Sequence, residues 1–239
     1  MTRTYVLSGI VLYLVFLVAT VPVAMLDGIS NRFSNGKIRF SETKGTVWQG
    51  SATLGIEGKP SGRFSWRVSL DEMLLARLHV AIMEEGEKER TDVVLTPSEL
   101  ELKHVSLTLP ASLLCLFDKQ LETVKPGGEL HVHADDFMLS KSIRGEIIAQ
   151  WDNASSSLTR VDPLGSYRIH ARGNASNIEI SLETLNGPLF LKGSGSWSQK
   201  GGLKFNGAGE SKNEGLSDLL RLAGPALGGG VYALKLGTS

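Results

Sequence analysis

The alternation of apolar and polar residues that recurs in short segments is the feature that most constrains this chain. Phe64, Trp66 and Val68 alternate with polar neighbours, and the same period of two returns at 78–82 and 178–182. Such a period places one face of a strand in a core and the other in solvent, which antiparallel sheets tolerate. The 27 glycines are scattered between these segments, as in a chain of many strands and tight turns. The pattern predicts a mainly β protein.

The strand pattern is interrupted at a few places. Before Pro110 the alternation predicts about five or six strands, with one slip near Lys103–His104. Helical spacing of apolar residues predicts short helices at 69–75, 111–124 and 217–222. We therefore expect a curved antiparallel β-sheet or half-open barrel with two or three short helices. The Pro-Gly-Gly sequence around 125–128 is the best candidate for an internal boundary.

An uncharged apolar run occupies 5–26 and predicts a transmembrane anchor. A helix of this length rises about 33 Å, enough to cross a hydrocarbon core of about 30 Å. The alternative is a cleaved signal peptide, but the run exceeds a usual signal core and lacks a small-x-small cleavage site. The expected organisation is a stub at 1–4, the anchor, and a β domain at 27–239.

The charges near the anchor leave its orientation open. Arg3 favours a cytoplasmic N-terminus, whereas Arg32, Lys37 and Arg39 follow the span closely. The whole chain has 25 basic and 25 acidic residues, and no basic run is interleaved with aromatics. This balance argues against nucleic acid as a partner. The single cysteine, Cys115, lies in an apolar run and is expected to be a buried small hydrophobe.

A search for chemistry finds one cluster of ligand types. On a strand, His131, His133 and Asp135 would share one face, as metal ligands can. We favour their being solvent-side residues opposite Val132 and Ala134, because no second ligand group is specified elsewhere. No nucleophile elbow, P-loop or dinucleotide fingerprint is present. The sequence therefore predicts no enzyme, no cofactor, and no catalytic, cofactor-binding or metal-binding residues. Function is expected in sheet edges, apolar concavities and the span.

An ordered set of motifs runs along nearly the whole chain and resembles the type II secretion system protein N family, also called general secretion pathway protein N. The motifs follow the N-terminal span in this order: GTVWQG (45–50), RFSWRVSLDEMLLARL (63–78), WDNASSSLTRVDPLGSYRIHARG (151–173), LNGPLFLKGSGSW (185–197) and LSDLLRLAGPALGGGVYALKL (216–236).

The resemblance implies a non-enzymatic accessory component of a Gram-negative machine that exports folded proteins from the periplasm. It implies a single-pass inner-membrane protein, N-in, with 27–239 in the periplasm, and partners among the other secretion components. No nucleic acid or small-molecule substrate is implied. Two segments depart from the family's pattern, namely the middle segment with Cys115 and the triplet Gly228-Gly229-Gly230.

Several structural expectations accompany this interpretation. Tryptophans on strands are expected to bury large apolar areas, with neighbouring glycines at bulges or bends. Open sheet edges, expected at Ser98 and Lys204, could recruit a partner strand. The alternative function is that of an AsmA-like membrane-anchored β protein that binds or carries lipid, with 178–182 pointing into an apolar trough. The weak similarity of KGTVWQG to RGEIIAQW leaves an internal duplication as an alternative.

Overall fold

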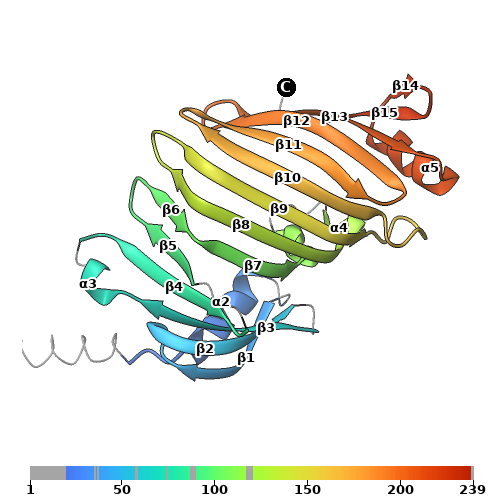
Figure 1. Ribbon diagram of the computed structural model, residues 1–239. Helices are drawn as coiled ribbons and strands as arrows, with labels where there is room; N and C mark the ends of the chain where they lie inside the picture. The colour runs from blue at the N-terminus through green and yellow to red at the C-terminus, as the bar shows by residue number, and fades with distance from the viewer. Residues whose placement is uncertain are drawn as a thin grey trace, which may run out of the picture. The chain divides into compact units, whose positions relative to one another are not determined.

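The computed structural model describes residues 20–34, 36, 38–56, 59–73, 75–86, 90–116 and 121–237. Its contacts divide the chain into a first unit, Met1–Lys88, and a second unit, Glu89–Ser239. In both units antiparallel strands dominate and the helices are short (Figure 1). The predicted mainly β, antiparallel class is therefore confirmed. Residues 125–128 lie inside the second unit, between a short helix and a strand.

The first unit contains four antiparallel strands in sequential order, β1-β2-β3-β4. Helix α2 precedes them and lies against β1, and the single-turn helix α3 lies between β3 and β4. The predicted helix at 69–75 is thus confirmed in its position. The elements are α2 (Ala24–Phe33), β1 (Ile38–Gly45), β2 (Gln49–Ile56), β3 (Lys59–Val68), α3 (Leu70–Met73) and β4 (Leu78–Glu84).

The second unit is a larger antiparallel sheet with the strand order β5-β6-β8-β9-β10-β11-β12-β13-β15-β14, in which β7 also pairs with β8. Its elements are β5 (Thr91–Leu95), β6 (Leu100–Lys103), β7 (Val105–Pro110), η1 (Ala111–Leu116), α4 (Leu121–Val124), β8 (Gly127–Leu139), β9 (Arg144–Ser155), β10 (Gly165–Asn174), β11 (Asn177–Asn186), β12 (Leu189–Ser198), β13 (Gly202–Ser211), α5 (Glu214–Ala223), β14 (Ala226–Gly228) and β15 (Val231–Gly237). Among the described strands of each unit, the first and the last do not pair, so neither sheet closes into a barrel.

Backbone irregularities occur where the alternation slips. His104 has a positive φ of 51° and separates β6 from β7, which confirms the slip expected near Lys103–His104. On β8 the pairing with β9 shifts between Asp135 and Met138. Opposite this bulge, Gly145 has a φ of 91°, and a Cβ atom there would lie 2.7 Å from the Phe137 Cα atom. Glycine is therefore required at this position, and such bulges bend the strand.

The described core of the second unit includes two hydrophobic clusters. One lies where α5 packs on the sheet, around Tyr167, Leu216 and Leu220. The other lies around Phe137 and Ile143 and includes the partly buried Ile178 and Trp197. The phenol of Tyr167 is 2% exposed and donates to the carbonyl oxygens of Leu164 and Leu189, at 3.3 and 3.0 Å. Burial of this side chain raises its pKa.

Several expectations need correction. Strands β1 and β5 were not expected, because β1 becomes polar after Phe40 and β5 is only five residues long. The helical spacing at 111–124 corresponds to η1 and α4 rather than to one helix. With α2 included, the short helical segments exceed the two or three expected.

Most of the predicted anchor, residues 5–19, lies outside the described residues. The end of the predicted span, from Ala24, belongs to α2, which continues to Phe33. Within the part of the chain that the structure describes, none of the helices has both the length and the apolar character needed to cross a bilayer.

Candidate functional site

The strands of the second unit carry polar side chains on one face and apolar side chains on the other. Cross-strand pairing puts Asp135, Glu146, Arg172, Glu179 and Lys204 in one row across the sheet. Residues paired directly across an antiparallel sheet share a face. We call this face the polar face. A second row on it runs through His133, Ile148, His170, Ser181, Ser194 and Asn206.

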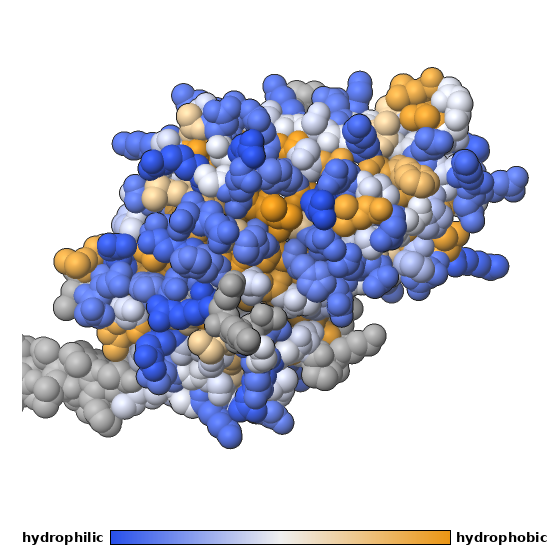
Figure 2. All heavy atoms as spheres, viewed as in Figure 1, coloured by the Kyte–Doolittle hydropathy of each residue, from blue (hydrophilic) through white to orange (hydrophobic). Residues whose placement is uncertain are grey.

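The opposite side of the same strands is the apolar face. It carries Ile147, Ile169, Ile178, Leu182 and Trp197, and helix α5 covers part of it with Leu216 and Leu220. Figure 2 shows mostly hydrophilic residues over the second unit on the side viewed, with hydrophobic residues between them.

A charged cluster lies on β9 and β10 of the polar face. The Glu146 carboxylate pairs through Oε2 with His170 Nε2 at 2.9 Å and through Oε1 with the Arg172 guanidinium at 2.6 Å. The hydrogen bond from His170, followed by that from Arg172, lowers the pKa of Glu146 below its usual value. These side chains are substantially exposed, so solvent and salt screen the interaction.

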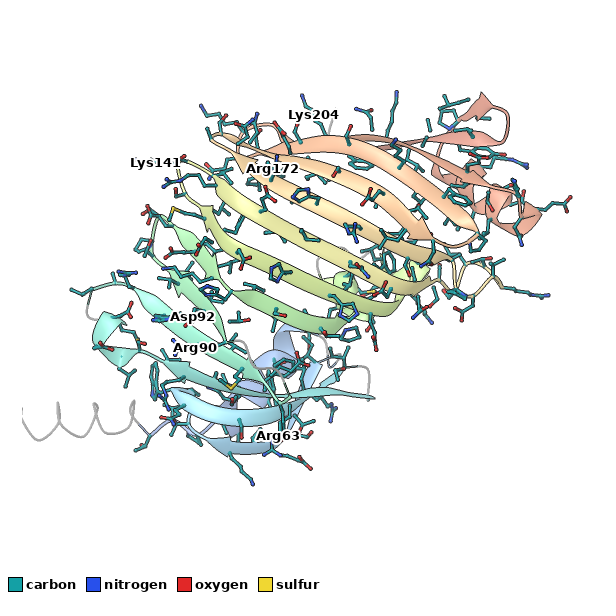
Figure 3. The ribbon with its side chains drawn as sticks, viewed as in Figure 1. Arg63, Arg90, Asp92, Lys141, Arg172 and Lys204 are labelled. Carbon is teal, nitrogen blue, oxygen red and sulfur yellow. The ribbon has the colours of Figure 1, made fainter. Side chains whose placement is uncertain are left out.

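A hollow of about 620 Å³ adjoins this cluster on β10–β13. Its lining includes three serine hydroxyls (Ser181, Ser194 and Ser196), with Arg172 and Lys204 on its flanks. Figure 3 labels these two cations on β10 and β13. Hydroxyls and charges of both signs suit contact with a polar surface. The Nε2 atom of His170 is paired with Glu146 at 2.9 Å.

The histidine cluster singled out in the sequence lies on the polar face, and Ala134 on the opposite face is 1% exposed. His131 and His133 contact different side chains. His131 contacts Thr108 Oγ1 at 3.0 Å and Asp152 Oδ2 at 3.4 Å, whereas His133 contacts Asp135 Oδ2 at 3.2 Å. Within the described ranges, no three His, Cys, Asp or Glu side chains converge as a metal site requires.

Cys115 is 6% exposed, and its thiol donates to the Leu121 carbonyl oxygen at 3.4 Å. This agrees with the expectation of a buried small hydrophobe.

The sheets differ at two of their ends, at β1 in the first unit and at β15 with β14 in the second. The outward N–H groups of Ile38 and Phe40 on β1 donate to Ser34 Oγ at 3.0 Å and to Asp27 Oδ1 at 2.9 Å, both from the α2 segment. Side chains of this segment therefore satisfy and block that edge. No local sequence pattern indicates this contact, because the carboxylate and the amide are 13 residues apart.

In the second unit the strand order ends with β15 and the short strand β14, and β14 pairs with only part of β15 (Figure 1). Strand β15 pairs with β13 along Val231–Gly237, but β14 reaches it only at Tyr232 and Val231. Lys204 was expected at an edge, but it pairs with Ser196 on β12 and Gly237 on β15. Ser98 lies in the turn between β5 and β6.

Comparison with known protein families matched residues 37–235 to the family described as "Type II secretion system (T2SS), protein N". The match covers most of the chain and includes strands of both units. No curated protein sequence was found to match the chain. No solved structure was found to match it either.

Proposed function

Since this chain belongs to the type II secretion system protein N family, we propose that it acts as a non-enzymatic accessory component of type II secretion through protein–protein contacts. In this proposal residues 5–26 anchor it in the inner membrane with its N-terminus in the cytoplasm. Residues 27–239 then lie in the periplasm and meet the other secretion components.

The family match over 37–235 is the observation that carries the proposal. The surface chemistry supports it. The hollow on the polar face combines charges of both signs with serine hydroxyls, which suits recognition of a polar protein surface.

A deletion and complementation experiment tests the role in secretion. Cells that lack this chain should retain a type II substrate in the periplasm, and the full-length chain expressed in trans should restore its export. Export unchanged by the deletion, in cells where loss of the secretion pore abolishes it, would refute the proposal.

The proposed topology has a separate test. Alkaline phosphatase fused after residue 239 is active only outside the cytoplasm, whereas green fluorescent protein exported in unfolded form does not fluoresce there. We expect an active phosphatase fusion and a dark fluorescent fusion. The reverse pair of results would contradict the N-in orientation.

Lipid binding by an AsmA-like β protein is the second candidate function. It is favoured by the apolar face, where Ile178 and Trp197 remain only partly buried against neighbouring strands. A photo-crosslinking residue at 178 or 180 should then give lipid adducts in intact cells. The same probe at Ser181, on the opposite face, is the matched control. Lipid adducts at 178 and 180, without protein adducts anywhere on the chain, would favour this alternative over the first.

A further inference from the structure

The outer edge of β15 has backbone groups that can accept another strand. The Ala233 N–H points away from β13 and donates to the Pro225 carbonyl oxygen at 2.9 Å. Backbone groups along an antiparallel strand alternate in direction, so those of Lys235 point the same way. Among the described residues, no strand lies beside Lys235 on that side.

The strand beside this edge, β14, is short. Strand β14 has three residues, all exposed, and its pairing with β15 joins Ala226 to Tyr232 and Gly228 to Val231. An unpaired row of N–H and C=O groups is a template for an added strand. At the β1 edge, the α2 segment occupies the equivalent groups with Ser34 and Asp27.

The side chains at this edge specify what kind of strand would fit. Lys235 pairs with Asn206 on the polar face, and Lys204 lies two positions further along β13 on the same face. The nearest acid on that face of β13, Glu210, lies four positions from Asn206 at the other end of β15. On the other face Leu234 packs against the apolar cluster under α5. An added strand therefore meets positive charge on one side and apolar surface on the other.

We propose that the β15 edge at 234–237 binds an extended, acidic segment of a partner protein, which adds to the sheet as an antiparallel strand. Alternate residues of that segment are apolar and lie beside Leu234, and carboxylates between them face Lys235 and Lys204. This proposal deepens the proposed function, on which its biological role rests. The binding chemistry is testable without it.

The direct test uses a fluorescent eight-residue peptide that alternates valine with glutamate, and the purified full-length chain. Lys235→Pro removes one outward N–H group and no bond to β13, a change that edge strands tolerate. We expect Lys235→Pro to weaken peptide binding at least tenfold. Lys235→Ala keeps the N–H group and removes the charge, so a smaller loss of roughly threefold is expected. Equal binding by Lys235→Pro and the unaltered chain would overturn the proposal, as would no binding at all.

Two controls separate edge pairing from general charge attraction or misfolding. A peptide with lysine in place of each glutamate should bind at least about tenfold more weakly. Lys212→Ala removes an exposed charge elsewhere in the second unit and should leave binding unchanged. Hydrogen exchange of the Lys235 amide should be fast in the free chain and slowed by the acidic peptide. An amide already protected in the free chain would contradict an open edge.

In cells, Lys235→Pro should reduce export of a type II substrate although the variant accumulates normally. Normal export by this variant, combined with loss of export on deletion of the chain, would overturn the edge proposal and leave the secretion role standing. Normal export after deletion would overturn the secretion role, while the peptide experiment still decides whether the edge binds a strand.

Discussion

Helices α2 and α5 each have ten residues, but they act on their sheets in different ways. The α2 segment lies against β1, and its polar side chains Asp27 and Ser34 accept the outward N–H groups of that strand. Helix α5 lies on the apolar face of the second sheet, where Leu216 is 0% and Leu220 3% exposed. A helix that covers a sheet face stabilises the core and leaves the strand edge available, whereas one that caps the edge removes it as a binding surface.

Removing the apolar contact of α5 with its sheet is expected to cause the largest loss of stability. Leu216→Ala removes a fully buried side chain and should lower the free energy of unfolding by about 2–5 kcal/mol. Denaturant unfolding of the full-length chain measures this change. Asp218→Ala on the exposed side of the same helix is the control, and it should stay within about 0.5 kcal/mol of the unaltered chain. Equal losses for both variants would show that α5 does not depend on its leucines.

A smaller loss is expected where an aromatic ring covers glycines. The Phe205 ring lies over Gly193, and an added Cβ atom would meet its Cε1 atom at 2.7 Å and the Asn206 carbonyl oxygen at 2.9 Å. Gly193→Ala should therefore cost about 1–3 kcal/mol of unfolding free energy. Ser194→Ala, at the exposed neighbouring position, is the matched control.

The first unit repeats this arrangement, since a Cβ atom on Gly50 would lie 2.9 Å from the Trp66 ring. Gly50→Ala should cost a similar amount, about 1–3 kcal/mol. If Gly50→Ala leaves the free energy of unfolding unchanged while Gly193→Ala lowers it, only the second unit depends on close contact between ring and backbone.

Removing the side-chain acceptor of an outward β1 amide should lower the free energy of unfolding by about 1 kcal/mol. Asp27→Ala removes the acceptor of the Phe40 N–H, at a cost of roughly 0.5–1.5 kcal/mol, and opens the edge. Hydrogen exchange of the Phe40 amide should become faster in this variant. Asp27→Asn keeps an acceptor oxygen and should keep most of the protection. Unchanged exchange in Asp27→Ala would remove the contrast between the two helices.

The smallest change in stability is expected at the exposed cluster of Glu146, His170 and Arg172 on the polar face. The folded-state pKa of Glu146 is lowered, so the ionised carboxylate contributes stability at neutral pH, and this contribution is lost as pH falls through the lowered pKa. Glu146→Gln should therefore be slightly less stable than the unaltered chain at pH 7. The difference should disappear in acid. Denaturant midpoints measured from pH 7 downward check this, and a difference that grows in acid would contradict it.

Much of the strand content could be predicted from the sequence, because alternation is a local property. The segment around Phe64 and Trp66 became β3, and the segment at 178–182 became part of β11. The helical stretch at 217–222 became α5, and Asn213 extends its start by accepting the Gly215 N–H at 3.0 Å. Strand β1 escaped prediction because its alternation stops after Phe40, where polar residues follow one another.

The candidate site was much less accessible to sequence reasoning. Glu146 and His170 are 24 residues apart, and only the register of β9 against β10 brings them to 2.9 Å. Likewise, no pattern around Lys204 indicates that β15 lies beyond it, so an interior position was mistaken for an edge.

The sequence by itself determined the family, the mainly β class and which side is polar on the strands that alternate regularly, because these follow from motif order and a period of two residues. Tertiary structure alone decided which strand ends a sheet, which helix blocks an edge and which leaves one open. Those features depend on pairing between distant segments, where hydrogen bonds such as that from Phe40 to Asp27 form only after the chain has folded.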